Sequence, residues 1–149
     1  MKNKRILFVC TGNTCRSPMA EVILKNKLKL AGVKNLKVSS AGIFANDGDP
    51  MSANSKEALK ILGYGTRNFK ARRLTEEMIK KSDMIVCMTE EHKSYLSGFN
   101  NVYTVSEVSG VGNVPDPYGQ DIIAYVKTSH VLEDACNEIL NKILEARGE

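Results

Sequence analysis

The stretch VCTGNTCRSP, residues 9–18, stands where a strand is expected to give way to a helix. Before it, residues 6–9 form a short, continuous apolar run, Ile-Leu-Phe-Val, which is typical of a strand buried on both faces of a parallel sheet. After it, Ser17 and Pro18 are the expected N-cap and first residue of a helix, with Glu21 in its first turn. The stretch therefore predicts a strand, a tight loop and a helix in succession.

The loop has the composition of an anion-binding site that carries a nucleophile. At a helix N-terminus, backbone N–H groups and the positive end of the helix dipole converge, which favours a phosphate group. The same field, with nearby cations, lowers a cysteine pKa from about 8.5 to roughly 3.5–7.5, so Cys10 is expected to be largely thiolate at neutral pH. Six positions on, Arg16 offers a planar fork of donors that can hold two phosphate oxygens at once.

The remaining small side chains of the loop have expected roles as well. The Ser17 hydroxyl can donate to the Cys10 sulfur, stabilising it as nucleophile and later as leaving group. Gly12 is expected to let the chain turn tightly, and the Asn13 side chain to tie the loop to its surroundings. Thr11, Thr14 and Cys15 complete the loop. The alternative is an ordinary strand-to-helix turn with a buried cysteine.

The rest of the chain alternates helices and strands. Expected helices are 17–31, 55–62, a short one capped by Thr75, one capped by Thr89 that ends near Gly98, and one from about Ile122 almost to the end; expected strands are 36–39, 84–88 and 102–104. The run 84–88 is apolar throughout and is expected in the centre of the sheet, with Cys87 in the core. The predicted fold is α/β: one domain over residues 1–149, in three layers, with a central parallel sheet of about four strands flanked by helices.

A long loop, residues 109–120, contains three glycines and two prolines and separates the last expected strand from the last helix. Long loops inside compact domains are usually functional, and the ligand crevice of an open α/β sheet lies beyond the carboxyl ends of its strands. This loop and the Cys10 loop both leave from such ends, so Asp116 can meet Cys10. The flanking Pro115 and Pro117 stiffen the backbone, which suits a residue that delivers a proton. Asp-Pro is also a common turn, so spacing alone leaves both roles open.

Length, charge and cysteine usage narrow the possible functions. No run approaches the ~20 apolar residues of a membrane span, and the N-terminus lacks a secretory signal, so a cytoplasmic protein without membrane contact is expected. Four scattered cysteines predict reduced thiols, with no metal or other cofactor. The net charge of +4 is too small and dispersed to argue for nucleic acid. His92 and His130 have polar neighbours and are expected at the surface.

Taken together, these motifs resemble the low-molecular-weight protein tyrosine phosphatases. Residues 10–18, followed by Met19-Ala20-Glu21, look like that family's phosphate-binding loop, and the resemblance covers nearly the whole chain. Further segments recur in the family's order and spacing: Ser40-Ala41-Gly42, 70–75 (KARRLT), 83–88 (DMIVCM) and Asp116-Pro117-Tyr118. The resemblance implies a phosphoprotein phosphatase that works through a phosphocysteine intermediate, with Cys10 as nucleophile, Arg16 as phosphate clamp and Asp116 as general acid.

The resemblance carries further expectations. Phe44, from the loop 41–51, is expected to flank the phosphorylated side chain, and Tyr118 to lie in the same cleft. Cys10 and Cys15 are expected to form a reversible disulfide that protects the nucleophile. The partners are expected to be phosphorylated proteins, with inorganic phosphate or other oxyanions as inhibitors, and the protein is expected to be a monomer.

The substrate and the reaction leave alternatives. Tyrosine phosphatases of the family often have an aliphatic side chain where this sequence has Thr14, whereas the bacterial protein-arginine-phosphatase branch resembles it in having threonine. We therefore expect phosphotyrosine hydrolysis, with phosphoarginine as the alternative substrate. An arsenate reductase would need relay thiols, for which Cys87 and Cys136 are poorly situated. A cysteine phosphocarrier would gain nothing from Asp116, and the full set of catalytic groups argues against a pure binding module.

Overall fold

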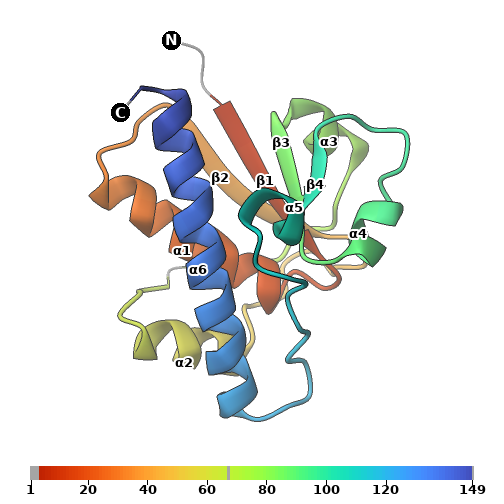
Figure 1. Ribbon diagram of the computed structural model, residues 1–149. Coiled ribbons are helices and arrows are strands. Elements are labelled where there is room, and N and C mark those ends of the chain that lie inside the picture. Colours follow the sequence, from red (N-terminus) through yellow and green to blue (C-terminus); the bar gives the residue numbers. More distant parts are fainter. Residues whose placement is uncertain (1–3, 67, 149) are drawn as a thin grey trace.

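A parallel four-stranded sheet in the order β2-β1-β3-β4 forms the middle layer of the computed structural model, which describes residues 4–66 and 68–148 (Figure 1). The strands are β1 (Lys4–Cys10), β2 (Leu36–Gly42), β3 (Met84–Cys87) and β4 (Val102–Thr104). The helices are α1 (Arg16–Leu30), α2 (Ala53–Ile61), α3 (Glu76–Lys81), α4 (Glu90–Ser94), α5 (Val105–Ser109) and α6 (Ile122–Ala146). The predicted α/β fold with a parallel sheet of four strands is confirmed.

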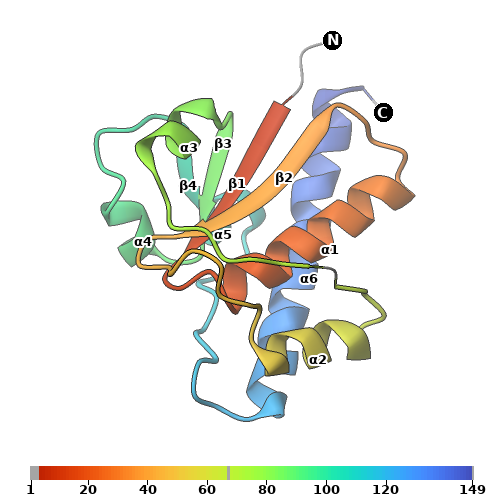
Figure 2. The ribbon, with the colours of Figure 1, turned by 180° about the vertical axis from the view of Figure 1, so that it is seen from behind.

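The two faces of the sheet are covered by different helices. Successive side chains of a strand point to opposite faces, and β1 accordingly divides its apolar residues between two core clusters. Ile6 and Phe8 pack in the larger cluster with residues of α1, α2, α5 and α6, whereas Leu7 and Val9 pack in the smaller cluster with Ile79 of α3. Figure 1 and its reverse view, Figure 2, show α1, α2 and α6 to one side of the sheet and α3 and α4 to the other.

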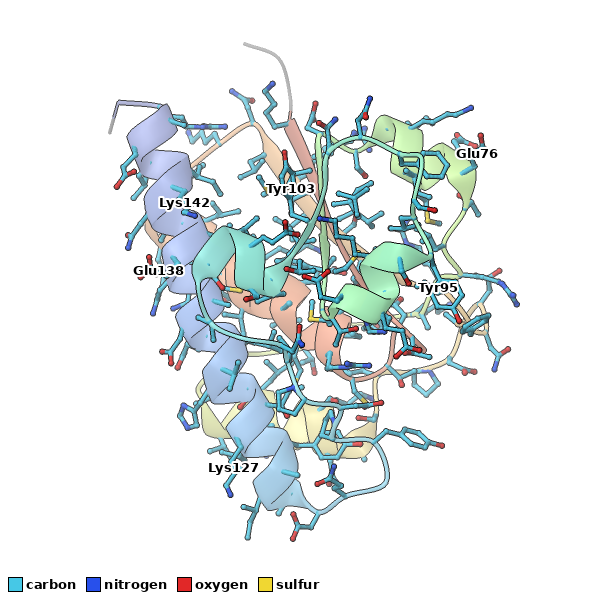
Figure 3. The ribbon with its side chains drawn as sticks, turned by 45° about the vertical axis from the view of Figure 1, so that its right-hand side comes forward. Glu76, Tyr95, Tyr103, Lys127, Glu138 and Lys142 are labelled. Carbon is cyan, nitrogen blue, oxygen red and sulfur yellow. The ribbon has the colours of Figure 1, made fainter. Side chains whose placement is uncertain are left out.

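The long helix α6 closes the larger face through one apolar stripe. Tyr125, Leu132 and Ile139 are buried at intervals of seven residues, and α6 packs on α1 and α2. Lys127 and Lys142 are exposed and point outward on the same helix (Figure 3). Within residues 4–66 and 68–148, no helix combines the length and the apolar character that a membrane span requires.

The sheet register brings two loops together at its carboxyl edge. Cys10, the last residue of β1, is paired with Gly42, the last residue of β2. Beyond the strands the two chains stay in contact, because the Ile43 N–H donates to the Cys10 carbonyl (3.0 Å) and the Phe44 N–H to the Thr11 carbonyl (2.9 Å). The loop after β1 is therefore braced by the chain that follows β2.

The start of α1 differs from the prediction. The helix begins at Arg16, with Cys15 as an N-cap that makes no side-chain capping bond, so Ser17 is inside the helix rather than at its cap. Glu21 lies beyond the first turn, where its carboxylate accepts from the Ser40 hydroxyl (2.6 Å) and pairs with Lys25. Both differences follow from the earlier helix start: Ser17 lies inside α1 with its hydroxyl against Cys10, and Glu21 falls in the second turn.

Several other boundaries also differ. Helix α2 begins earlier than expected, because Ser52 accepts from the Ser55 N–H and caps it, and β2 continues to Gly42. The helix capped by Thr89 ends at Ser94, well before Gly98. Helix α5 was not predicted, although its capping box, Thr104 with Glu107, is a recognisable signal in the sequence.

Candidate active site

The loops after β1 and after α5 share a pocket of about 210 Å³ at the carboxyl edge of the sheet. Its lining combines the two loops that the sequence singled out: Cys10, Thr11, Gly12, Thr14, Cys15, Arg16, Asp116 and Tyr118. Residues a hundred positions apart in the chain thus face one small cavity, which brings together a thiol, a guanidinium and a carboxylate.

The Cys10 sulfur is buried and makes a hydrogen bond with the Ser17 hydroxyl. Ser17 Oγ lies 2.8 Å from Cys10 Sγ, and the Asn13 side-chain amide donates to the same oxygen (2.9 Å). Because that oxygen already accepts from Asn13, the hydroxyl hydrogen is available to the sulfur.

The pKa expected for Cys10 needs correction. Burial raises the pKa of the Cys10 thiol above its usual value, and the Ser17 hydrogen bonds, the Arg16 charge and the Asn13 backbone oppose this rise without cancelling it. The expectation of a lowered pKa was wrong because it counted the helix terminus and the arginine but not the desolvation of a fully buried sulfur. The polar groups around Cys10 nevertheless all act to favour the thiolate.

Asn13 makes the sharp turn of the loop. It has a positive φ of 56°, and its side chain donates to Ser17 and Ser40 (both 2.9 Å) and accepts from the backbone N–H of Arg72 (2.8 Å). Asparagine tolerates this left-handed conformation better than most residues. The prediction that Asn13 ties the loop to its surroundings is confirmed. Gly12 lies in the same bend without a positive φ, so Asn13 and not Gly12 takes the left-handed conformation in this loop.

The glycine that the loop needs is Gly42, at the end of the neighbouring strand. A Cβ atom on Gly42 would lie 2.6 Å from the Thr11 carbonyl oxygen and 2.8 Å from the Asn13 backbone nitrogen, closer than real side chains allow. A Cβ atom on Gly12 would have the Thr14 hydroxyl at 3.8 Å as its nearest neighbour, which is an ordinary contact. In the sequence, Gly42 stands out only as the last residue of the family segment Ser40-Ala41-Gly42, and no local pattern indicates its role in the loop.

Arg16 is buried at the base of the pocket and is held from both loops. Its Nη1 donates to the Val114 carbonyl (3.3 Å), and its Nη2 donates to the Thr11 hydroxyl (3.4 Å) and lies 3.5 Å from Asp116 Oδ2. A guanidinium fixed by acceptors on different segments has little freedom to turn, so its charge stays directed at one region of the pocket.

Asp116 and Tyr118 are the accessible side of the pocket. The Asp116 side chain is 51% exposed, and its Oδ1 accepts from the Tyr118 N–H (3.1 Å). Tyr118 is 76% exposed. Phe44, which was expected to flank the substrate, does not line this pocket; it is 54% exposed and packs edge-on against Tyr95 of the segment after α4. Phe44 contacts the loop after β1 through its backbone N–H, which donates to the Thr11 carbonyl.

His92 is the residue whose position differs most from the expectation based on the sequence. It was expected at the surface, but it is buried and its Nε2 lies 2.9 Å from the Thr11 hydroxyl. Its place just after β3, at the carboxyl edge of the sheet, was the available signal. His130 is exposed on α6, as predicted.

The other cysteines have no access to the pocket except Cys15. Cys15 Sγ lies 3.6 Å from both the Ser52 and the Tyr125 hydroxyls. Cys87 is fully buried, as predicted, and burial raises the pKa of Cys87 and of Cys136 to about 12. Neither of these thiols is suited to relay a disulfide.

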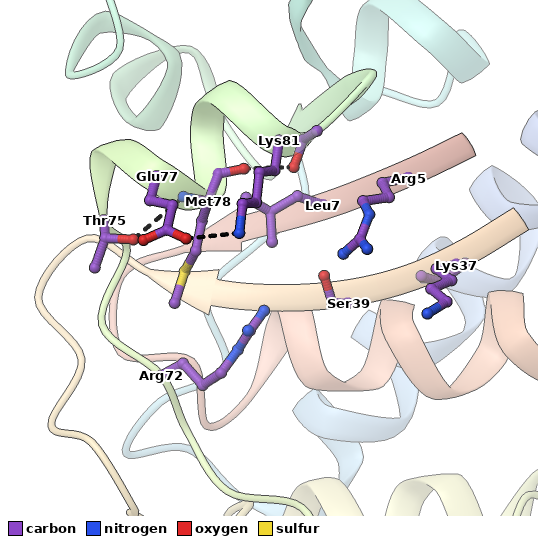
Figure 4. A pocket seen from close by; sticks show the side chains of 11 residues that line it. Arg5, Leu7, Lys37, Ser39, Arg72, Thr75, Glu77, Met78 and Lys81 are labelled. Atoms are coloured by element: carbon purple, nitrogen blue, oxygen red, sulfur yellow. Dashed lines mark hydrogen bonds and ion pairs between the residues drawn. The ribbon is translucent and has the colours of Figure 1, made fainter. Parts of the chain in front are cut away.

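A larger hollow lies away from this site, against the sheet face that carries Leu7 (Figure 4). It has a volume of about 550 Å³, and its lining includes Arg5, Lys37 and Arg72 but none of the pocket's thiol, guanidinium or carboxylate groups. Size alone therefore does not identify the candidate active site; the chemistry of the lining does.

Comparison with known proteins agrees with this chemistry. Residues 5–148 match the family described as low molecular weight phosphotyrosine protein phosphatase. A protein-arginine-phosphatase of Bacillus subtilis (strain 168) is 36% identical over 149 residues, covering 95% of this chain and 98% of the relative. The low molecular weight protein-tyrosine-phosphatase PtpB of Staphylococcus haemolyticus (strain JCSC1435) is 37% identical over 129 residues, covering 83% and 88%.

The solved structures agree as well. The YwlE arginine phosphatase from Geobacillus stearothermophilus matches with a TM-score of 0.88 at 34% identity, covering 97% of this chain and 95% of that one. The fold, the cysteine loop and these relatives define a cysteine-based phosphatase that acts on phosphoproteins. The chain belongs to the low molecular weight phosphotyrosine protein phosphatase family.

Proposed function

We propose that this protein hydrolyses phosphoarginine in protein substrates through a phosphocysteine formed on Cys10. The observation that carries the proposal is the shared pocket, which is lined by Thr14 together with Cys10, Arg16 and Asp116. The relatives named as protein-arginine-phosphatases, one of which matches along nearly its whole length, add support.

In the first step the Cys10 thiolate attacks phosphorus in line with the bond to the substrate nitrogen. The S–P bond forms, the P–N bond breaks, and Asp116 gives its proton to the departing guanidino group. Arg16 and the backbone N–H groups of the loop stabilise the charge on the equatorial oxygens. This role fits the three acceptors that hold the guanidinium from two loops.

In the second step water attacks the phosphocysteine. Asp116, now ionised, accepts a proton from that water, the S–P bond breaks, and phosphate leaves. The Ser17 hydroxyl, 2.8 Å from the sulfur, donates to the thiolate as it departs. Each cycle consumes one water and returns both Cys10 and Asp116 to their starting forms.

The preference for phosphoarginine depends on Thr14. A hydroxyl at this position can accept from a guanidino nitrogen next to the transferred phosphorus, which an aliphatic side chain cannot do. A site that hydrogen-bonds its substrate also discriminates against analogues without the group.

Phosphotyrosine is the second candidate, and Tyr118 favours it. Its ring is exposed at the pocket and could stack against a phenyl ring. The name of the family also refers to this substrate.

The test is the ratio of kcat/KM values on phosphoarginine and phosphotyrosine peptides of the same sequence, measured for the wild type, Thr14→Val and Thr14→Ser. Valine keeps the shape and removes the hydroxyl, whereas serine keeps the hydroxyl and is the matched control. We expect phosphoarginine to be preferred by more than about tenfold, and the preference to be lost in Thr14→Val only. A wild type that prefers phosphotyrosine would reject the phosphoarginine assignment, and full activity in Cys10→Ser would reject the mechanism.

We also infer a redox response of the site. Cys10 and Cys15 both line the pocket, and the expected disulfide between them would protect the nucleophile from further oxidation. Inactivation by peroxide should then be reversed by dithiothreitol in the wild type but not in Cys15→Ala. Loss of activity that dithiothreitol cannot reverse in the wild type would contradict this inference.

Three further expectations follow from the proposed reaction. Inorganic phosphate and other oxyanions should inhibit competitively, because they fit the same cradle. A nucleophile that must stay reduced suits the cytoplasm as the working compartment. We expect the monomer to be the active form.

A further inference from the structure

We propose that His92 is a positioning residue for the phosphate clamp: its neutral imidazole holds the hydroxyl of Thr11, which in turn holds Arg16. The inference rests on the proposed function, because it assigns a role within the same site. His92 does not line the pocket and touches no reacting atom, so any effect on the reaction must pass through Thr11.

Both nitrogens of the buried ring have partners. Nε2 lies 2.9 Å from the Thr11 hydroxyl, and Nδ1 lies 3.1 Å from the Thr89 hydroxyl. Thr89 also caps α4 by accepting from the His92 backbone N–H (3.3 Å). The ring is therefore fixed at both ends, between the helix cap and the phosphate-binding loop.

The donors and acceptors allow a chain of bonds that runs from Arg16 through Thr11 to His92. Arg16 has donors only, so its Nη2 must donate to the Thr11 oxygen (3.4 Å). The single hydroxyl hydrogen of Thr11 is then available for the lone pair of His92 Nε2. With its proton on Nδ1, the ring donates to Thr89, whose oxygen has two lone pairs for the two N–H groups of His92. In this arrangement the Thr11 hydroxyl donates to the ring, whereas in the other neutral tautomer Nε2 donates to Thr11 and the Thr89 hydroxyl donates to Nδ1; either way the ring holds the Thr11 side chain.

A protonated ring would break the arrangement. It would present N–H groups at both nitrogens, so Thr11 could no longer donate to it, and it would add a positive charge close to Arg16. Burial and, to a lesser extent, the Arg16 charge lower the pKa of His92 to about 4, with Asp116 opposing them. At neutral pH the ring is consequently uncharged and can accept from Thr11.

The expected consequence of losing His92 concerns Arg16. Without the ring, the Thr11 side chain can move among its χ1 rotamers, and the contact that fixes Nη2 becomes intermittent. Nη1 keeps the Val114 carbonyl, so the guanidinium stays in the pocket but is less well oriented. Because Arg16 would grip substrate and transition state alike, both phosphate affinity and kcat should fall.

The experiment compares His92→Leu, His92→Gln and His130→Leu. The measurements are the dissociation constant of inorganic phosphate, kcat and KM on p-nitrophenyl phosphate, and the melting temperature. We expect His92→Leu to weaken phosphate binding and lower kcat by about tenfold each, the value of one hydrogen bond. Glutamine offers an acceptor for Thr11 and should recover most of the loss, and the exposed His130→Leu should match the wild type. A loss of melting temperature with unchanged phosphate affinity and kcat would overturn the proposal.

A double-mutant cycle tests the route through Thr11. If His92 acts only through that hydroxyl, adding His92→Leu to Thr11→Val should lower kcat by less than about twofold, whereas independent effects would multiply. The protonation of the ring offers a test that needs no variant. Nitrogen-15 shifts of the wild type at pH 7 should show a neutral His92 ring with one protonated nitrogen, and a ring protonated at both nitrogens would overturn the proposal even if His92→Leu fails to fold.

The outcomes separate this inference from the proposed function. If the wild type hydrolyses phosphopeptides and His92→Leu matches it in every measurement, the role of His92 is rejected and the proposed function stands. A wild type that binds phosphate without hydrolysing any phosphopeptide would reject the proposed function, and weaker phosphate binding in His92→Leu would still support the role of His92.

Discussion

Residues 11–15 and residues 115–120 line the same pocket, but the rest of the protein holds them in different ways. The first loop is tied to other parts of the chain: Asn13 to Ser40 and Arg72, Cys15 to Tyr125, and Thr11 to His92. In the second loop the hydrogen bonds of Asp116 and Gln120 stay within the loop itself. Arg16, which directly follows the first loop, donates to the Val114 carbonyl just before the second loop and pairs with Asp116 within it.

This difference corresponds to two kinds of chemical task. Groups that stabilise developing charge work best when they are fixed in advance and shielded from water, as in the first loop. A general acid must reach leaving groups on varied protein substrates, which suits the exposed second loop. The difference predicts that changes in the first loop alter both stability and activity, whereas changes in the second alter activity alone.

The largest effect is expected for Arg16→Lys. A lysine cannot hold two phosphate oxygens in a fork, so kcat/KM on phosphopeptides should fall by about 10³-fold. The matched control is Arg147→Lys, which changes an arginine bonded to the Lys34 carbonyl at the surface and should leave kcat/KM unchanged. A loss below tenfold would mean that the fork does not bind the phosphate.

The folding stability should depend on pH through His92, whose ring contacts Thr11 of the first loop. The pKa of His92 is about 4 in the folded protein, where burial and Arg16 lower it and Asp116 opposes them, against about 6.5 when unfolded. Above pH 6.5 both states are neutral. As the pH falls from 6.5 towards 4, only the unfolded state takes up the proton, so folding stability is lost, by up to about 3 kcal/mol.

Urea unfolding at pH 7 and pH 4.5 measures this effect. The wild type should lose more free energy of unfolding than His92→Gln over that interval, while His130→Gln should behave as the wild type. An equal loss in the wild type and in His92→Gln would show that His92 is not kept neutral by its burial.

Asp116→Asn probes the second loop. We expect kcat/KM, which reports only the steps up to formation of the phosphocysteine, to fall by about 10²-fold on phenyl phosphate, which has a poor leaving group, and to change little on dinitrophenyl phosphate, whose leaving group needs no acid. The melting temperature should stay the same, because the carboxylate is half-exposed and its ion pair contributes little. The exposed Asp134→Asn on α6 is the control, and an equal loss on both esters would exclude a general acid.

A pair of glycines compares the packing of the two loops. In Gly42→Ala the new methyl group collides with the Thr11 carbonyl, so we expect a loss of about 2 kcal/mol of stability and reduced activity. In Gly112→Ala the new methyl group has nothing within 4 Å, and stability should change by less than about 0.5 kcal/mol. Equal effects in urea unfolding would contradict the comparison.

The smallest effect is expected for Ser17→Ala. Removing the hydroxyl takes away the hydrogen bond that favours the thiolate, so the pKa of Cys10 should rise further above its usual value. The loss of one bond to a charged sulfur should lower kcat by about tenfold. The pH dependence of alkylation by iodoacetate measures the pKa, and a value equal to or below that of the wild type would reject this role of Ser17.

The sequence by itself determined the fold class, the course of the chain and the two loops that meet at the pocket. These conclusions depend on local patterns: an apolar run before residues 10–16, Ser-Pro after them, and a long loop that carries Asp116. Because the carboxyl ends of parallel strands meet at one edge of a sheet, the sequence also predicts that Asp116 lies close to Cys10. The family segments named in the sequence pointed the same way, and the match over residues 5–148 agrees with them.

Only the tertiary structure decided how the site is built around those residues. It assigned the turn to Asn13 and the close approach to Gly42, buried His92 against Thr11, and left Phe44 outside the pocket. It also reversed the expected direction of the Cys10 pKa, because desolvation depends on every atom that surrounds the sulfur. Contacts between residues far apart in the chain, and the exclusion of water they cause, leave no pattern in the local sequence.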